Sequence, residues 1–190
     1  MAAITGVYHL TDNPVEYQPA RTNHFRFLVH GLDNLLRADA ESNVDYVNNA
    51  QEVIDFSVIS FDVPHFKQNA IEVKRGNSRT YFAGDPSFSE GSLKINDFIG
   101  ADGKSVLEAW QALSYNVIND TIAPSYVYKK DATILEYTSD DKLVRYWDLK
   151  GCWVSGLQED GYNAESSNKK TVTATIKYDR AIPHRPSELR

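Results

Sequence analysis

The chain has 190 residues, of which 42% are hydrophobic, and its 20 lysines and arginines against 26 aspartates and glutamates give a formal charge of −6. This is enough chain to bury the core of one domain, and the single cysteine excludes a small scaffold held by internal disulfides. The shortage of basic residues argues against tight nucleic-acid binding, and no apolar run approaches the roughly 18 residues that predict a membrane span.

The two ends of the chain are expected to lie outside the domain. Residues 1–20 show no hydrophobic periodicity and contain Pro14 and Pro19, which is typical of an N-terminal arm on a surface. Residues 181–190 are expected to form a C-terminal tail. A single domain is therefore predicted over residues 21–180.

The first part of the domain predicts strands. NHFRFLVHGL, from Asn23, alternates apolar and polar positions. An irregular insertion follows at about residues 35–50. EVIDFSVISFDV, from Glu52, is predicted as a second strand that ends at Pro64, because its apolar residues also recur at every second position. These alternating positions are Ile54, Phe56 and Val58.

A long loop or hairpin is predicted after the third strand, AIEVK, which begins at Ala70. The segment RGNSRTYFAGDPSF has glycine, asparagine, aspartate and proline near both ends, and these residues favour turns. Between them lie arginines and aromatic residues, which are enriched in protein interfaces. Tyr81 and Phe82 either contact a partner or fold back onto their own core, and the sequence leaves both possibilities open.

One helix is predicted, at about residues 105–118. Ser105 and Glu108 have the spacing of a capping box, and the apolar residues that follow form one stripe at 3.6 residues per turn. The stripe consists of Val106, Leu107, Trp110, Leu113 and Val117.

The remainder of the chain predicts more strands. ATILEYT, LVRYWDL and CWVSGL are three short stretches rich in β-branched and aromatic residues, with a turn and Gly151 as separators. TVTATIKYD, from Thr171, alternates fully between apolar and polar residues, so one face is core and the other is wet. The fold class is therefore mainly β: an antiparallel β-sandwich or partly closed barrel with one flanking α-helix.

No specific catalytic, metal or cofactor site emerges from the sequence. His24 and His30 share a strand face with Arg26 but have no third ligand at a suitable spacing, and Cys152 is expected to be an inert buried residue. We therefore expect a protein that is not an enzyme and holds no cofactor or metal. A carbohydrate-binding sandwich is the alternative from another class, but its three tryptophans, Trp110, Trp147 and Trp153, fit core packing better.

The order of these landmarks resembles the tail tube proteins of contractile-tailed bacteriophages, which are related in fold to type VI secretion tube proteins. The resemblance rests on NHFRFLV, FAGDPSF, LEAWQ, YKKDATILEY and DLKGCW in that order, followed by the last alternating strand, and it covers roughly residues 22–179. It implies a structural virion protein that forms homohexameric rings, in which shared strands complete an inner β-barrel. The stacked rings form the conduit through which DNA passes, without specific binding, at genome ejection.

The resemblance also implies partners and contact residues. The partners are copies of the chain and the tail sheath, tape-measure and baseplate proteins, in a virion tail assembled in the host cytoplasm. The implied contacts between subunits or rings are Arg75, Asn77, Arg79, Tyr81, Phe82 and Asp85. The implied lumen-facing residues are Thr171, Thr173, Thr175 and Lys177.

The sequence leaves two related functions open as alternatives. One is a ring at the end of the tail or in the baseplate, which the additional ends and the insertion favour. The other is the tube subunit of a type VI-like contractile injection system.

Overall fold

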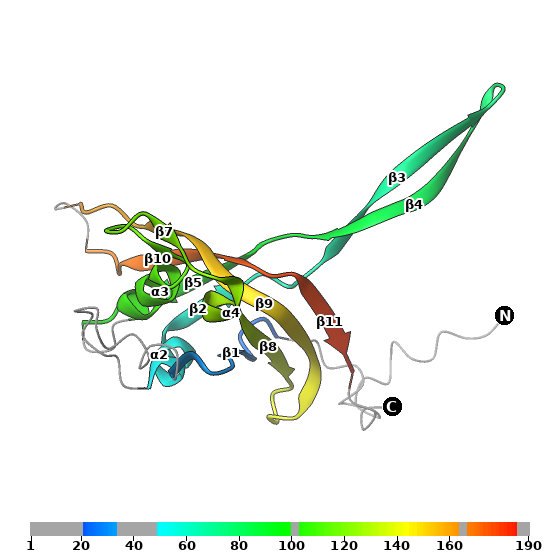
Figure 1. Ribbon diagram of the computed structural model, residues 1–190. Coiled ribbons are helices and arrows are strands. Elements are labelled where there is room, and N and C mark those ends of the chain that lie inside the picture. Colours follow the sequence, from blue (N-terminus) through cyan, green and yellow to red (C-terminus); the bar gives the residue numbers. More distant parts are fainter. Residues whose placement is uncertain (1–20, 34–48, 100–102, 164–166, 186–190) are drawn as a thin grey trace, which may run out of the picture.

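The computed structural model describes residues 21–33, 49–99, 103–163 and 167–185, so the predicted N-terminal arm and most of the predicted insertion lie outside the described residues. Its described elements form one seven-stranded antiparallel sheet, two separate two-stranded hairpins and short helices (Figure 1). The strands are β1 (Phe25–Val29), β2 (Val58–Phe61), β3 (Phe66–Arg75), β4 (Ser78–Phe88), β5 (Gly91–Asn96), β6 (Tyr115–Asn116), β7 (Thr121–Ile122), β8 (Lys130–Tyr137), β9 (Leu143–Glu159), β10 (Thr171–Lys177) and β11 (Arg180–His184). The helices are α2 (Ala50–Ser57), α3 (Gly103–Ala112) and α4 (Ser125–Tyr128).

The main sheet has the strand order β1-β8-β9-β10-β5-β2, and β11 also pairs with β9. All of its pairs are antiparallel. The central strand β9 belongs to both halves of the sheet: its first half pairs with β8 and β11, and its second half pairs with β10. No helix in the described ranges combines the length and hydropathy that crossing a membrane requires.

The predicted break between two strands at Gly151 is wrong. LVRYWDL and CWVSGL, predicted as separate strands, form the single 17-residue strand β9. Gly151 has φ 68°, which a glycine adopts without steric cost, so it bends the strand instead of ending it. Asp131 secures the bend, because it accepts hydrogen bonds from Lys150 Nζ at 2.7 Å and from Gly151 N at 3.2 Å. The hydrogen bond from Lys150 has the largest effect on the pKa of Asp131, and together with the bond from Gly151 it holds this pKa below its usual value.

Substitution of Gly151 by alanine is expected to destabilise the protein by about 1–3 kcal/mol. An alanine there has to keep a left-handed backbone, and its Cβ meets the carboxylate of Asp179. Urea unfolding followed by tryptophan fluorescence measures the change. Gly156→Ala is the matched control on the same strand, because nothing lies within 4 Å of its added Cβ. Equal stability of the two variants would contradict the assigned bend.

The predicted C-terminal tail is also partly wrong, because it begins inside a strand. β11 pairs with β9 from Arg180 opposite Lys150 to His184 opposite Tyr146. The ring of His184 stacks on that of Tyr146 with centroids 4.6 Å apart. Pro183 is compatible with this strand because β11 lies at an edge of its half of the sheet, where a missing N–H leaves no ladder bond unmade.

The two ends of the sheet approach each other without pairing. Within the described chain β1 pairs with β8 and β2 pairs with β5, and no ladder joins β1 to β2. Their side chains meet instead: the rings of Phe27 and Phe61 stack at 4.7 Å. The predicted fold class, a mainly β antiparallel sandwich or partly closed barrel with one main helix, is therefore confirmed.

The first half of the predicted second strand is a helix. Residues 50–57 form α2, in which Ala50, Ile54 and Ser57 are buried at helical spacing while Phe56 is exposed. Gln51 explains why the helix lies beside β1. Its Oε1 accepts a hydrogen bond from Val29 N at 2.7 Å, and its Nε2 donates one to Phe27 O at 3.1 Å. The side chain thus occupies part of the unpaired edge of β1.

The main helix, α3, lies where the sequence predicts a helix, but it begins and ends at other residues than predicted. It begins at Gly103, so Ser105 lies inside the helix and does not cap it. It ends at Ala112, because both the N–H and the hydroxyl of Ser114 bond to the carbonyl of Gln111, which closes a tight last turn. Val117, at the end of the predicted stripe, is exposed on a short hairpin.

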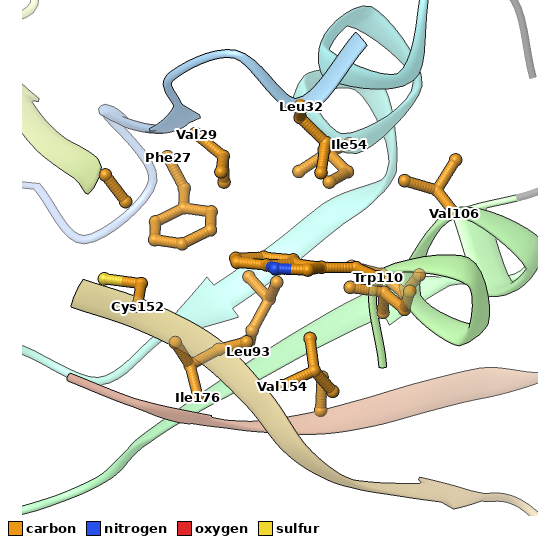
Figure 2. Packing of buried hydrophobic residues seen from close by; sticks show 14 of the residues in the cluster. Phe27, Val29, Leu32, Ile54, Leu93, Val106, Trp110, Cys152, Val154 and Ile176 are labelled. Carbon is orange, nitrogen blue, oxygen red and sulfur yellow. The ribbon is translucent and has the colours of Figure 1, made fainter. Parts of the chain in front are cut away.

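Trp110 lies at the centre of the core. Figure 2 shows its indole between Phe27 on one side and Leu93 with Val154 on the other. The side chain is fully buried, and its Nε1 donates a hydrogen bond to the carbonyl of Tyr128 at 3.1 Å. The indole of Trp110 therefore lies between the two halves of the sheet, whereas the sequence predicts only a helix that flanks the sheet.

Candidate assembly surfaces

The β3–β4 hairpin projects away from the domain (Figure 1). Its strands pair from Phe66 opposite Phe88 to Arg75 opposite Ser78, and Gly76 with Asn77 forms the turn at the tip. Every residue of β3 and most of β4 are exposed. An isolated two-stranded hairpin is marginally stable in water at best, so contact with another surface would stabilise this element.

The two faces of the hairpin differ in chemistry. The register places Ile71 opposite Phe82 and Val73 opposite Thr80, so these side chains share one apolar face. Alternation places the others on the opposite, charged face, which consists of Glu72, Lys74, Arg79 and Tyr81. There Arg79 Nη1 lies 3.4 Å from Glu72 Oε1.

The predicted contact residues all lie on this hairpin. Arg75 and Asn77 are at its tip, and Arg79, Tyr81, Phe82 and Asp85 belong to β4. The turn expected at Gly84 and Asp85 is wrong, because both residues lie within the strand. Tyr81 is 62% and Phe82 54% exposed, so neither folds back onto its own core. Ile71 and Val73 are not among the predicted contact residues, although the alternation in AIEVK places them on one face.

The second predicted set lies on β10, where the expected alternation is present. Val172, Ala174 and Ile176 are fully buried, whereas Thr173 and Thr175 are half-buried and Lys177 is exposed on the other face. Thr171 departs from the prediction: it is buried, and it donates hydrogen bonds from its N–H and hydroxyl to Asp160. It is therefore held by its own chain.

The neighbouring strands continue the polar face of β10. Thr173 lies opposite Lys94 on β5 and Gln158 on β9, and Thr175 lies opposite Ser92 on β5. Paired residues of antiparallel strands project to the same side, so the four strands β2, β5, β10 and β9 carry one continuous polar surface. Lys177 lies within 3.1 Å of Glu90 on this surface.

This half of the sheet has an unpaired edge at each end. At one end, β2 has β5 as its only partner among the described residues. At the other, β8 pairs with β9 as far as Cys152, and residues 153–159 pair with β10 alone within the described chain. Unpaired edges offer N–H and C=O groups to another chain. Within the described chain, this half of the sheet therefore has two free strand edges, and a strand of another chain could pair with each of them.

The other residues considered for chemistry have structural surroundings. His30 Nε2 lies 2.8 Å from Thr133 Oγ1, and Arg26 pairs with Asp55. Within the described ranges no three histidine, cysteine, aspartate or glutamate residues group as metal ligands. Burial of Trp110 confirms its core role; Trp147 packs against the core and Trp153 contacts Tyr128 edge to face.

Cys152 is fully buried, and this burial raises the pKa of its thiol to about 12. Because the thiolate is the reactive form, we expect no modification of the folded protein by a thiol reagent at pH 8 and one thiol per chain after unfolding in urea. Colorimetric thiol titration measures both values. The exposed Ser78→Cys variant is the control and is expected to react once when folded. Rapid modification of folded wild-type protein would show that Cys152 is accessible.

Comparison with known proteins gives a consistent result for the fold. No protein-family model and no curated protein matches the sequence. A chain of the extracellular contractile injection system PVC, from its sheath-tube complex in the extended state, is similar over 93% of this chain and 97% of that one, with 20% identity and a TM-score of 0.60. A chain of the PVC sheath/tube terminator has 19% identity and a TM-score of 0.61 over 90% and 99%. A chain of the tube terminating cap of the anti-feeding prophage has 15% identity and a TM-score of 0.58 over 88% and 92%. The resemblance in sequence landmarks is therefore confirmed in structure, and the chain has the tail-tube-like fold of contractile injection systems.

Proposed function

We propose that this protein is a ring-forming structural subunit of the tube in a contractile tail. The observation that carries the proposal is the β3–β4 hairpin, which extends from the domain with an apolar face that the described part of the chain leaves exposed. A surface of this kind is typical of a protein that is buried in an assembly. The structural neighbours, which belong to sheath-tube, terminator and cap assemblies, support it.

The ring is proposed to form through the unpaired edges of the main sheet. β2 of one copy meets residues 153–159 of the next, and six copies close one inner barrel without a free edge. The polar face that carries Thr173, Thr175 and Lys177 then lines the lumen. Thr171 is excluded from this lining because it is buried against Asp160.

The β3–β4 hairpin is proposed to reach a neighbouring subunit or the next ring. The residues that act there are the tip pair Arg75 and Asn77, the β4 residues Arg79, Tyr81, Phe82 and Asp85, and the apolar pair Ile71 and Val73. Arginine and aromatic side chains provide the anchors of such contacts, and the apolar face provides buried area.

The proposed setting is a phage virion tail, assembled in the host cytoplasm around a tape-measure protein and enclosed by a sheath above a baseplate. In that setting the tube conducts DNA without binding it, which suits a chain of charge −6. The neighbours favour a second setting, the tube of a contractile injection system.

A terminal ring is the second candidate function, and the structural neighbours support it as well as they support a tube subunit. The TM-score to the terminator chain, 0.61, equals within 0.01 that to the sheath-tube chain, 0.60. The two roles differ in polymerisation, since a tube subunit stacks into many rings and a terminal protein stops at one.

Sedimentation velocity over a concentration series, with negative-stain images of the same samples, tests the proposal. We expect a species of six times 21.4 kDa that stacks into hollow tubes of uniform width as concentration rises. Single rings at every concentration would favour the terminal function. A monomer at every concentration, up to the highest at which the protein stays in solution, would contradict both.

A further inference from the structure

A second apolar feature lies on the β6–β7 hairpin, away from the β3–β4 hairpin. We call it the β6–β7 tip and define it by Val117, Ile118 and Ile122, which are 80%, 92% and 80% exposed. Such exposure of three aliphatic side chains on one short turn has no role in the core of this chain. The tip lies beside α3, to which β6 is linked directly (Figure 1).

The backbone of the β6–β7 tip is held in place by its own polar residues. Asn116 Oδ1 accepts hydrogen bonds from Ile118 N at 2.9 Å and Asn119 N at 3.2 Å. The hydroxyl of Tyr115 donates a bond to Asp120 Oδ1 at 2.7 Å. These bonds present Val117 and Ile118 in a fixed position, so docking them costs little conformational entropy.

An apolar pocket of about 280 Å³ lies where the sheet fails to close, between β1, β2, β8 and β9. We call it the β1–β2 pocket. Its apolar lining consists of Phe25, Phe61, Val63, Ile134 and Trp147.

The two carboxylates of the β1–β2 pocket already have partners in their own chain. Glu136 Oε2 lies 2.8 Å from Arg145 Nε, and Asp62 Oδ2 accepts a hydrogen bond from Ser92 N at 3.0 Å. Their charges are therefore partly satisfied before any ligand enters, which favours an apolar occupant over a cationic one.

The tip and the pocket belong to opposite ends of the half-sheet β2-β5-β10-β9. The pocket contains Phe61 and Val63, from β2 and the residues that follow it. The helix α3 packs on β9, where Lys104 Nζ lies 2.9 Å from Glu159 Oε1, and β6 directly follows the C-terminal end of α3. The tip is therefore carried on the side of the half-sheet that ends in β9. When β2 of one copy meets residues 153–159 of the next, the tip and the pocket are therefore brought to the same junction.

We propose that the β6–β7 tip of one subunit inserts Val117 and Ile118 into the β1–β2 pocket of the adjacent subunit in the ring. The inference rests on the proposed function, because it assumes the ring. The contact is heterologous: a projection on one surface fits a recess on another, which is the kind of interface that closes a ring of identical chains. It seals the wall of the ring outside the strand ladder by burying apolar side chains on both partners.

Cross-linking between cysteines tests the contact. An Ile118→Cys chain and a Val63→Cys chain are mixed, assembled and treated with a short bismaleimide; Cys152 is buried and does not compete. We expect cross-linked dimers in the mixture and not with either chain alone, and a ladder up to six chains with the double variant. Tyr162→Cys replaces Ile118→Cys in the control, since it is 92% exposed and outside the tip. Absence of the specific product in assembled rings would overturn the inference.

A pair of introduced opposite charges provides the second test of the contact. Ile118→Asp or Val63→Lys alone is expected to lower ring affinity at least tenfold, and the double variant is expected to recover most of it. Both residues are exposed in the single chain, so the circular dichroism spectrum and melting temperature should not change.

Other occupants of the pocket give different results. If residues 1–20 of the same chain fill it, Leu10→Cys cross-links to Val63→Cys within one chain and Ile118→Cys does not, which overturns the inference. If Ile118→Asp still forms rings with wild-type affinity, the inference fails and the proposed function stands. If wild-type protein forms no rings, the proposed function fails first.

Discussion

Replacement of both Ile71 and Phe82 by serine is expected to raise the concentration needed for stacked tubes at least tenfold while leaving the stability of the domain nearly unchanged. Both side chains are 54% exposed in the single chain and contribute little to its core. Complete burial of such a side chain in an assembly is worth roughly 1.5–3 kcal/mol, and a loss of 1.4 kcal/mol per contact is already a factor of ten in affinity. The effect recurs at every subunit of a ring.

The measurement is the onset of light scattering over a concentration series, with the thermal unfolding of each variant recorded beside it. Lys74→Gln is the control, because it lies on the charged face of the same hairpin and keeps the apolar face intact. We expect it to shift the onset less than threefold. An equal shift for both variants would show that the apolar face is not the docking face.

Replacement of Trp110 by alanine is expected to have the largest effect on folding, a loss of about 3–5 kcal/mol. The indole is fully buried between the two halves of the sheet, and its removal leaves a cavity and the carbonyl of Tyr128 without its donor. For a domain of this size such a loss is a large part of the free energy of unfolding.

Urea unfolding followed by far-ultraviolet circular dichroism measures the effect of Trp110→Ala. Tyr162→Ala is the control, since its ring is 92% exposed, and we expect a change below about 0.5 kcal/mol. Trp110→Phe is expected to fall between the two because it refills part of the cavity. A loss below 1 kcal/mol for Trp110→Ala would mean that the helix α3 does not pack as described.

The spacing of apolar residues correctly predicted the helix and the strand that bury one face and expose the other. Trp110 and Leu107 fall on a helix stripe and are buried, and the residues of β10 alternate as expected. Ile54 shows the limit of the method. Its burial fits the spacing of a strand as well as that of a helix, and its alternation with Phe56 favoured a strand. The contacts that hold residues 50–57 beside β1 as a helix come from Gln51, which bonds to backbone atoms 22 to 24 residues away.

The candidate surfaces were predictable to a smaller extent. Turn residues and aromatic content located the segment around Tyr81 and Phe82, but only the strand register showed that Phe82 pairs with Ile71 and defines an apolar face. The pocket beside Val63 could not be predicted, because it is formed by four strands that are distant in sequence. The bend at Gly151 was mistaken for a break because a glycine at positive φ serves either purpose.

We propose that this chain forms a ring whose inner wall is the polar face of β10 and its neighbours. A cryo-electron microscopy reconstruction of the purified assembly tests it most directly, at a resolution that traces the strands. We expect six subunits, with Thr173, Thr175 and Lys177 facing the lumen and the β3–β4 hairpin against a neighbouring subunit or ring. An assembly in which these three residues face outward, or in which the hairpin contacts nothing, would contradict it.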